Sequence, residues 1–304
     1  MNIVFMGTPD FAVASLAALQ TAGFNIVGVV TAADKPAGRG QKLNESAVKK
    51  YATSHQLKVL QPTKLKDPQF LKELADLKAD LQVVVAFRML PEAVWNMPPK
   101  GTINLHASLL PQYRGAAPIN HAIINGETKT GVSTFLLQHE IDTGEVIFME
   151  ETPISPEDTA GTLHDRLMEI GAELIVKTVQ ALASGNYTSR AQENTANLKP
   201  APKIFKEFCE INWEQDVTVV YNHIRGLSPY PTAFTYLNNK ILKVFSASKE
   251  ICPTTIAPGK MLSDGKSFLK FACNNGYIHL IEVQLEGKKR MTISDFLRGQ
   301  RIEA

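Results

Sequence analysis

Short apolar runs that alternate with helical patterns do most to constrain how this chain can fold. They lie at residues 2–6, 25–31 and 81–86, and a helix is predicted near 67–78. After the first run, apolar residues recur at helical spacing up to Gly23, which is a stop signal for a helix. Strands that are apolar throughout are typical of a parallel sheet buried on both faces. The first part of the chain therefore predicts an open α/β domain.

The chain changes character after residue 185. Residues 186–204 are polar and contain two closely spaced prolines, which predicts an exposed linker. Beyond it, short runs alternate with turn signals such as Asn238-Asn239, at residues 232–237, 241–247, 267–273 and 277–285. Such spacing predicts a small barrel, of the OB type. With 304 residues available, we expect one domain at 1–185, a linker at 186–204 and a second domain at 205–304.

The composition says more about the cellular compartment of the protein than about its binding partner. The formal net charge is +2, which by itself identifies no ligand. The three cysteines form no CxxC pair, so neither a disulfide framework nor a zinc site is expected. No stretch approaches the roughly 20 apolar residues of a membrane span, and the first apolar run is too short for a signal peptide. We expect a cytoplasmic protein without a bound metal.

One segment is locally basic. Residues 34–50 hold five basic residues (Lys35, Arg39, Lys42, Lys49 and Lys50) against two acidic ones, and they are rich in glycine. Charge alone favours a solvated loop. The alternative is an arm that contacts phosphates.

Two segments carry residues suited to chemistry at a carbonyl group. If residues 103–106 form a strand, Asn104 and His106 project from the same face. An amide N–H can donate to a developing oxyanion, and an imidazole can move protons. Asp142 lies in an Asp-Thr-Gly turn, and it could orient His106 if that turn neighbours the strand.

Several other interpretations compete with this one. The Asp-Thr-Gly turn also occurs in aspartic proteases, but those need two such carboxylates in two β lobes. The first turn, Gly7-Thr8-Pro9-Asp10, lacks the second glycine of a dinucleotide-binding loop, so nicotinamide binding is not expected. A non-catalytic RNA-binding module would leave the Asn-His-Asp set to coincidence. The other histidines are taken as structural, with His139 the one considered for a site because it lies near Asp142.

The order and spacing of these motifs resemble the formyltetrahydrofolate-dependent formyltransferases. The resemblance spans nearly the whole chain. It is carried by Asn104-x-His106 with Ser108-Leu109-Leu110-Pro111, by Asp142-Thr143-Gly144, and by the segments 5–11, 36–40, 114–119 and 226–231. It implies a Rossmann-like open, mostly parallel sheet domain joined to an OB-like barrel that binds tRNA. It also implies transfer of a formyl group from 10-formyltetrahydrofolate to the α-amine of initiator methionyl-tRNA. Independently of the resemblance, we expect a monomer. A small amine, such as a nucleotide or an amino sugar, is the alternative acceptor.

The resemblance also assigns roles to particular residues. The catalytic Asn, His and Asp of the family fall on Asn104, His106 and Asp142, and no metal is implied. The folate loop falls on Ser108, Leu109, Leu110 and Pro111, with Phe87, Arg88 and Leu90 along the pterin wall. Many members carry Tyr-Gly where this chain has Phe87-Arg88. The arginine of the family's basic loop, which acts at the tRNA acceptor end, falls on Arg39, and Lys35 and Lys42 support it.

Overall fold

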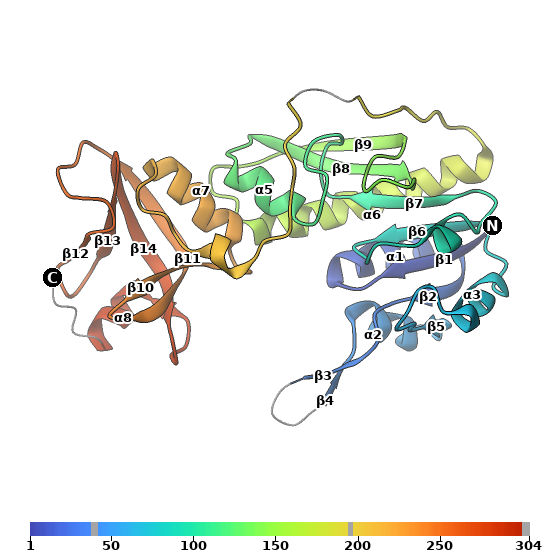
Figure 1. Cartoon of the computed structure of the whole chain (residues 1–304), viewed down its shortest axis with the longest axis horizontal. Helices are drawn as coiled ribbons and strands as arrows, with labels where there is room; N and C mark the ends of the chain where they lie inside the picture. Colours follow the sequence, from blue (N-terminus) through green and yellow to red (C-terminus); the bar gives the residue numbers. More distant parts are fainter. Residues whose placement is uncertain (38–41, 194–196, 300–304) are drawn as a thin grey trace. The chain divides into compact units, whose positions relative to one another are not determined.

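The computed structural model describes residues 1–37, 42–193 and 197–299 (Figure 1). The chain forms two compact units that interleave along the sequence. The first contains residues 1–115, 131–152 and 164–200, and the second contains residues 116–130, 153–163 and 201–304.

A seven-stranded sheet with the order β5-β2-β1-β6-β7-β8-β9 forms the centre of the first unit. Its strands are β1 (Asn2–Gly7), β2 (Asn25–Val30), β5 (Val59–Leu60), β6 (Leu81–Val85), β7 (Thr102–His106), β8 (Lys129–Leu136) and β9 (Val146–Pro153). The first five of these run parallel, and β8 runs antiparallel to β7. The predicted strands at 2–6, 25–31 and 81–86 correspond to β1, β2 and β6. The expected Rossmann-like, mostly parallel sheet is confirmed.

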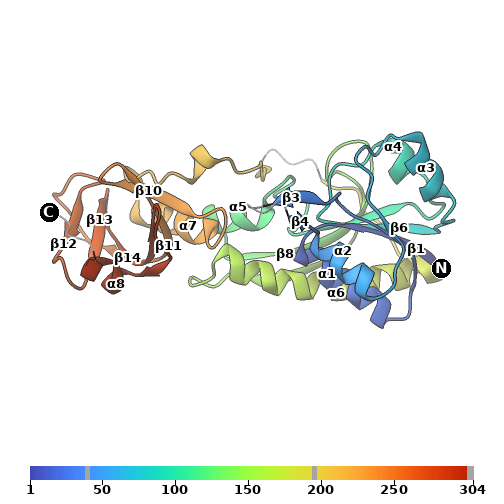
Figure 2. The same cartoon turned by 90° about the horizontal axis from the view of Figure 1, so that it is seen from below.

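Helices cover both faces of this sheet (Figure 2). On one side lie α1 (Asp10–Thr21) and α6 (Ala160–Ser184), and on the other lie α3 (Pro68–Ala75) and α4 (Glu92–Trp95). α2 (Ala47–Ser54) follows β4 (Lys42–Asn44) in the chain. On the α6 side, a Cβ at Gly171 would lie 2.7 Å from Leu105 of β7, so glycine permits close packing there. On the α3 side, Phe70 and Leu74 share a buried cluster with Met6 and Val84. Burial on both faces explains the uninterrupted apolar strands.

The second unit is built on a six-stranded antiparallel sheet. The strands are β10 (Ala233–Leu237), β11 (Lys240–Ile251), β12 (Met261–Ser263), β13 (Leu269–Cys273), β14 (Gly276–Leu285) and β15 (Met291–Thr292). Asn238 and Asn239 both have positive φ and join β10 to β11 in a two-residue turn, as the sequence predicted. Register shifts near Ser246 interrupt the long pairing of β11 with β14 and allow β11 to curl. The antiparallel half-barrel agrees with the expected OB-like domain.

Helices and a buried core complete this second unit. Its helices are α5 (Pro118–Ile124), the 3₁₀ helix η1 (Lys206–Cys209), α7 (Val217–Leu227) and α8 (Ile293–Gly299). Trp213 stacks on Phe271 at 4.6 Å between ring centroids, and its indole N–H donates to Thr235 Oγ1 at 3.0 Å. In the described part of the chain, no helix is long and apolar enough to cross a membrane.

Candidate active site

Asn104 and His106 lie at the carboxyl end of β7, where open α/β sheets bind their ligands. They are two residues apart and project from the same face, as predicted. His106 is only 7% exposed, whereas Asn104 is partly exposed. No hydrogen-bond partner for the Asn104 amide is found within residues 1–37, 42–193 and 197–299. Its N–H groups can therefore donate to a ligand.

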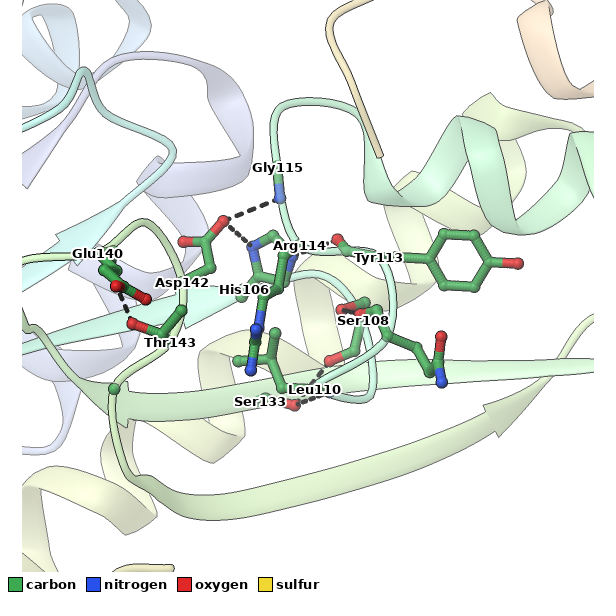
Figure 3. Close-up of polar contacts among 12 residues, drawn as sticks. His106, Ser108, Leu110, Tyr113, Arg114, Gly115, Ser133, Glu140, Asp142 and Thr143 are labelled. Carbon is green, nitrogen blue, oxygen red and sulfur yellow. Dashed lines mark hydrogen bonds and ion pairs between the residues drawn. The ribbon is translucent and has the colours of Figure 1, made fainter. Parts of the chain in front are cut away.

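The ring of His106 is fixed by one backbone group and faces one carboxylate (Figure 3). Its Nε2 lies 2.8 Å from the carbonyl oxygen of Tyr113. A carbonyl can only accept, so Nε2 carries a proton and donates it there. Nδ1 then faces Asp142 Oδ2 at 3.8 Å, which is longer than a direct hydrogen bond. In the neutral ring, Nδ1 is the nitrogen that can accept a proton.

The Asp142 turn has a constrained backbone. Asp142 has φ 55°, which lies in the left-handed region that most residues avoid. Its Oδ2 accepts a hydrogen bond from the N–H of Gly115 at 2.9 Å. A Cβ at Gly144 would lie 1.6 Å from the carbonyl oxygen of Leu136, so only glycine fits this approach. The turn and the 113–115 segment thus converge on His106 from two sides (Figure 3).

Ser133 of β8 holds the Ser108–Pro111 loop in place. Its hydroxyl donates to the carbonyl oxygen of Ser108 at 2.6 Å and accepts from the N–H of Leu110 at 3.1 Å. Ser108 in turn donates to the carbonyl oxygen of Gln112 at 2.6 Å. Ser108 and Leu110 are buried, while Leu109 and Pro111 are half-buried. The loop is therefore preformed beside Asn104 and His106.

The residues predicted for the pterin wall follow β6. Leu90 is buried and Phe87 is half-buried, and both belong to the apolar cluster on the α3 side of the sheet. The guanidinium of Arg88 donates to the carbonyl oxygens of Pro62 and Thr63, the latter at 3.0 Å. Arg88 thus anchors the loop after β5, and its contact with folate stays a prediction.

The basic segment forms a β hairpin where it is described. β3 (Lys35–Ala37) pairs antiparallel with β4 (Lys42–Asn44), and Lys35 is exposed. Arg39, which the resemblance places at the tRNA acceptor end, lies outside the described residues. Lys42 is described only through its backbone pairing with Ala37. The roles of these three residues in tRNA binding stay predictions.

An ion-pair cluster lies at the base of that hairpin. Lys49 pairs with Asp34, and with Glu45 at 2.8 Å. The hydrogen bond from Lys49 lowers the pKa of Asp34, with a second contribution from Gln61. Lys49, one of the five basic residues of this segment, is therefore ion-paired with neighbouring carboxylates.

Two backbone groups in the site carry no side-chain signal in the sequence. They are the carbonyl of Tyr113, which selects the tautomer of His106, and the N–H of Gly115, which holds Asp142. The sequence signal nearest to them is Gly115 itself, because a glycine marks a place where the backbone can adopt a positive φ, and the structure gives Gly115 φ 122°. Within the described ranges, no cluster of three or more His, Cys, Asp or Glu could hold a metal ion.

Comparisons with known proteins assign the chain to a family. The formyl transferase profile matches residues 1–179, and the formyl transferase C-terminal domain profile matches residues 203–301. The methionyl-tRNA formyltransferase of Bacteroides fragilis is 54% identical, with 98% of this chain and 95% of the relative covered. That of Flavobacterium johnsoniae is 51% identical, with 98% and 96% covered.

Solved structures share the fold at lower identity. An N-formyltransferase from Helicobacter canadensis, in complex with folinic acid and dTDP-3-aminofucose, has a TM-score of 0.70 at 21% identity, with 93% of this chain and 98% of that chain covered. HypX from Aquifex aeolicus, in complex with tetrahydrofolic acid, has a TM-score of 0.66 at 18% identity, with 97% and 46% covered.

Because the two formyl transferase profiles together cover most of the chain, this protein, with its Rossmann-like sheet and its antiparallel barrel domain, is a formyl transferase. With 51–54% identity over almost its whole length, the chain belongs to the methionyl-tRNA formyltransferase family. The resemblance seen in the sequence is confirmed. This membership excludes both a nicotinamide-binding enzyme and a non-catalytic RNA-binding module.

Proposed function

We propose that this protein transfers the formyl group of 10-formyltetrahydrofolate to the α-amine of initiator methionyl-tRNA. The product would be N-formylmethionyl-tRNA for translation initiation. The observation that carries the acceptor assignment is the 54% identity to a methionyl-tRNA formyltransferase across 98% of the chain. A sugar 3N-formyl transferase and the N-formyltransferase in complex with dTDP-3-aminofucose match at only 20% and 21% identity, so they do not favour a small amine as acceptor. The protein would act in the cytoplasm as a monomer.

The chemistry begins with attack of the acceptor amine on the formyl carbon. A new C–N bond forms, and negative charge develops on the formyl oxygen. The Asn104 amide, which has no partner among the described residues, donates to that oxyanion. Removal of one such donor typically lowers the rate by about 10²–10³.

His106 moves the proton that this reaction must relocate. Nδ1 accepts it from the attacking amine, since Nε2 already donates to the carbonyl of Tyr113. Asp142, 3.8 Å away, stabilises the imidazolium that results. The tetrahedral intermediate then collapses, the C–N bond to N10 of the folate breaks, and His106 returns the proton to that nitrogen. Positioned proton transfer contributes about 10²–10⁴ in rate.

The folate lies between the loops that follow β6 and β7. Ser108 to Pro111 form one wall, and Phe87 and Leu90 provide apolar surface on the other. Lys35, Arg39 and Lys42 contact the acceptor end of the tRNA, where phosphate charge favours cations.

Formyl transfer with several acceptors tests the assignment. The purified chain is mixed with 10-formyltetrahydrofolate and offered charged initiator methionyl-tRNA, uncharged tRNA, free methionine or a nucleotide-linked amino sugar. Transfer to the charged tRNA alone is expected. Transfer only to the amino sugar would replace the acceptor, and no transfer to any amine would refute the proposed function.

A further inference from the structure

Gln192, in the polar segment that follows α6, contacts both elements that hold Asp142. Its Nε2 donates to the carbonyl oxygens of Asp142 and Gly144, at 2.8 Å each. Its Oε1 accepts from Arg114 Nε at 3.0 Å and from Arg114 Nη2 at 2.7 Å. All four hydrogen-bonding capacities of the amide are therefore used.

These contacts join two segments that are far apart in the sequence. The Asp142 turn supplies the carboxylate, and the segment with Arg114 and Gly115 supplies the N–H that orients it. Asp142 has a positive φ, and such a conformation persists only when its surroundings hold it. The two hydrogen bonds from the Gln192 amide to the carbonyl oxygens of Asp142 and Gly144 provide that restraint.

The approach of Gln192 to the site is itself fixed. Arg190 and Val146 exchange two backbone hydrogen bonds, at 2.8 and 2.9 Å, which pair this segment with the start of β9. Gln192 follows two residues later and is half-buried.

We propose that Gln192 is a positioning residue of the transfer reaction, which acts by holding the Asp142 turn against the Arg114–Gly115 backbone. Its amide is occupied by these four hydrogen bonds, so its effect passes through Asp142 to His106. This inference rests on the proposed function. A shift of about 1 Å in a catalytic group can lower a rate by about 10².

Two variants separate this role from loss of packing. Gln192→Ala removes the whole amide. Gln192→Glu keeps the shape and strengthens the pair with Arg114, but a carboxylate cannot donate to the two carbonyls of the turn. Both variants are expected to lower kcat about tenfold while KM for folate and for tRNA stays within about twofold.

The matched control is Ser189→Ala. The Ser189 hydroxyl donates to the Glu145 carboxylate, and so ties down the same segment, three residues before Gln192, without a bond to Asp142, Gly144 or Arg114. We expect kcat within about twofold of wild type. An equal loss in this variant would show that detachment of the segment lowers the rate, and would overturn the proposal.

A double-mutant cycle with Asp142→Asn completes the test. If Gln192 acts through the carboxylate, Gln192→Glu should cost less than about twofold once that carboxylate is gone. The same tenfold loss in both backgrounds would overturn the proposal. An inactive wild-type enzyme would instead count against the proposed function, so the two failures are distinguishable.

Discussion

Replacement of Ser133 by alanine removes a single hydroxyl that holds the Ser108–Pro111 loop. Ser133 is fully buried, and its Oγ donates to the carbonyl oxygen of Ser108 and accepts from the N–H of Leu110. Ser133→Ala leaves both backbone groups without that partner. The cavity created is no larger than one oxygen atom, so lost packing contributes little.

The expected loss of stability follows from burial. A buried polar group that loses its partner costs about 1–3 kcal/mol. Two such groups give an expected loss of about 2–6 kcal/mol. Ser263 makes the same pair of bonds in a more exposed turn. Its hydroxyl donates to the carbonyl oxygen of Phe268 at 2.7 Å and accepts from the N–H of Gly265 at 3.0 Å. Water can replace both, so Ser263→Ala should cost below about 1 kcal/mol.

Urea denaturation of the two variants and the wild type measures these free energies, and a folate titration measures KM for the donor. Ser133→Ala should lose the larger stability and raise KM for folate, because its loop loosens. Equal losses in Ser133→Ala and Ser263→Ala would refute the view that burial of the Ser133 bonds locks the loop.

Three further outcomes are expected. Gly144→Ala should lower kcat about tenfold or more, measured by formyl transfer, because a Cβ 1.6 Å from Leu136 O must displace the Asp142 turn; unchanged kcat would contradict this. Burial raises the pKa of Cys273 from 9.0 to about 11, so the folded state holds the proton more tightly and the free energy of unfolding should fall between those pH values. That fall should be smaller in Cys273→Ala, and an identical fall by denaturation would contradict the assignment. Lys35→Gln should reduce the salt dependence of tRNA binding by about one unit of slope in a log–log plot, whereas an unchanged slope would exclude a phosphate contact.

The sequence predicted the buried parts of the fold well. Apolar runs identified β1, β2 and β6, since strands buried on both faces need apolar side chains throughout. The Asn238-Asn239 pair identified the β10–β11 turn, because asparagine tolerates the positive φ that this turn requires. The antiparallel direction of β8 was not predicted, since pairing direction depends on contacts distant in sequence.

The site was predicted as a set of side chains but not as a network. Asn104 and His106 followed from strand alternation, and the proximity of Asp142 was conditional on a turn that the structure now shows beside His106. The carbonyl of Tyr113 and the amide of Gln192 could not be predicted, because backbone groups and a polar segment 50 residues beyond Asp142 give no local pattern.

Single-turnover formyl transfer, with 10-formyltetrahydrofolate and methionyl-tRNA both saturating, tests the central claim most directly. Asn104→Ala should transfer about 10²–10³ times more slowly than wild type, and His106→Ala about 10²–10⁴ times more slowly, with folate binding retained in both. Asp142→Asn should also be slow, because it removes the charge that stabilises protonated His106. Near wild-type rates in all three variants would contradict the account.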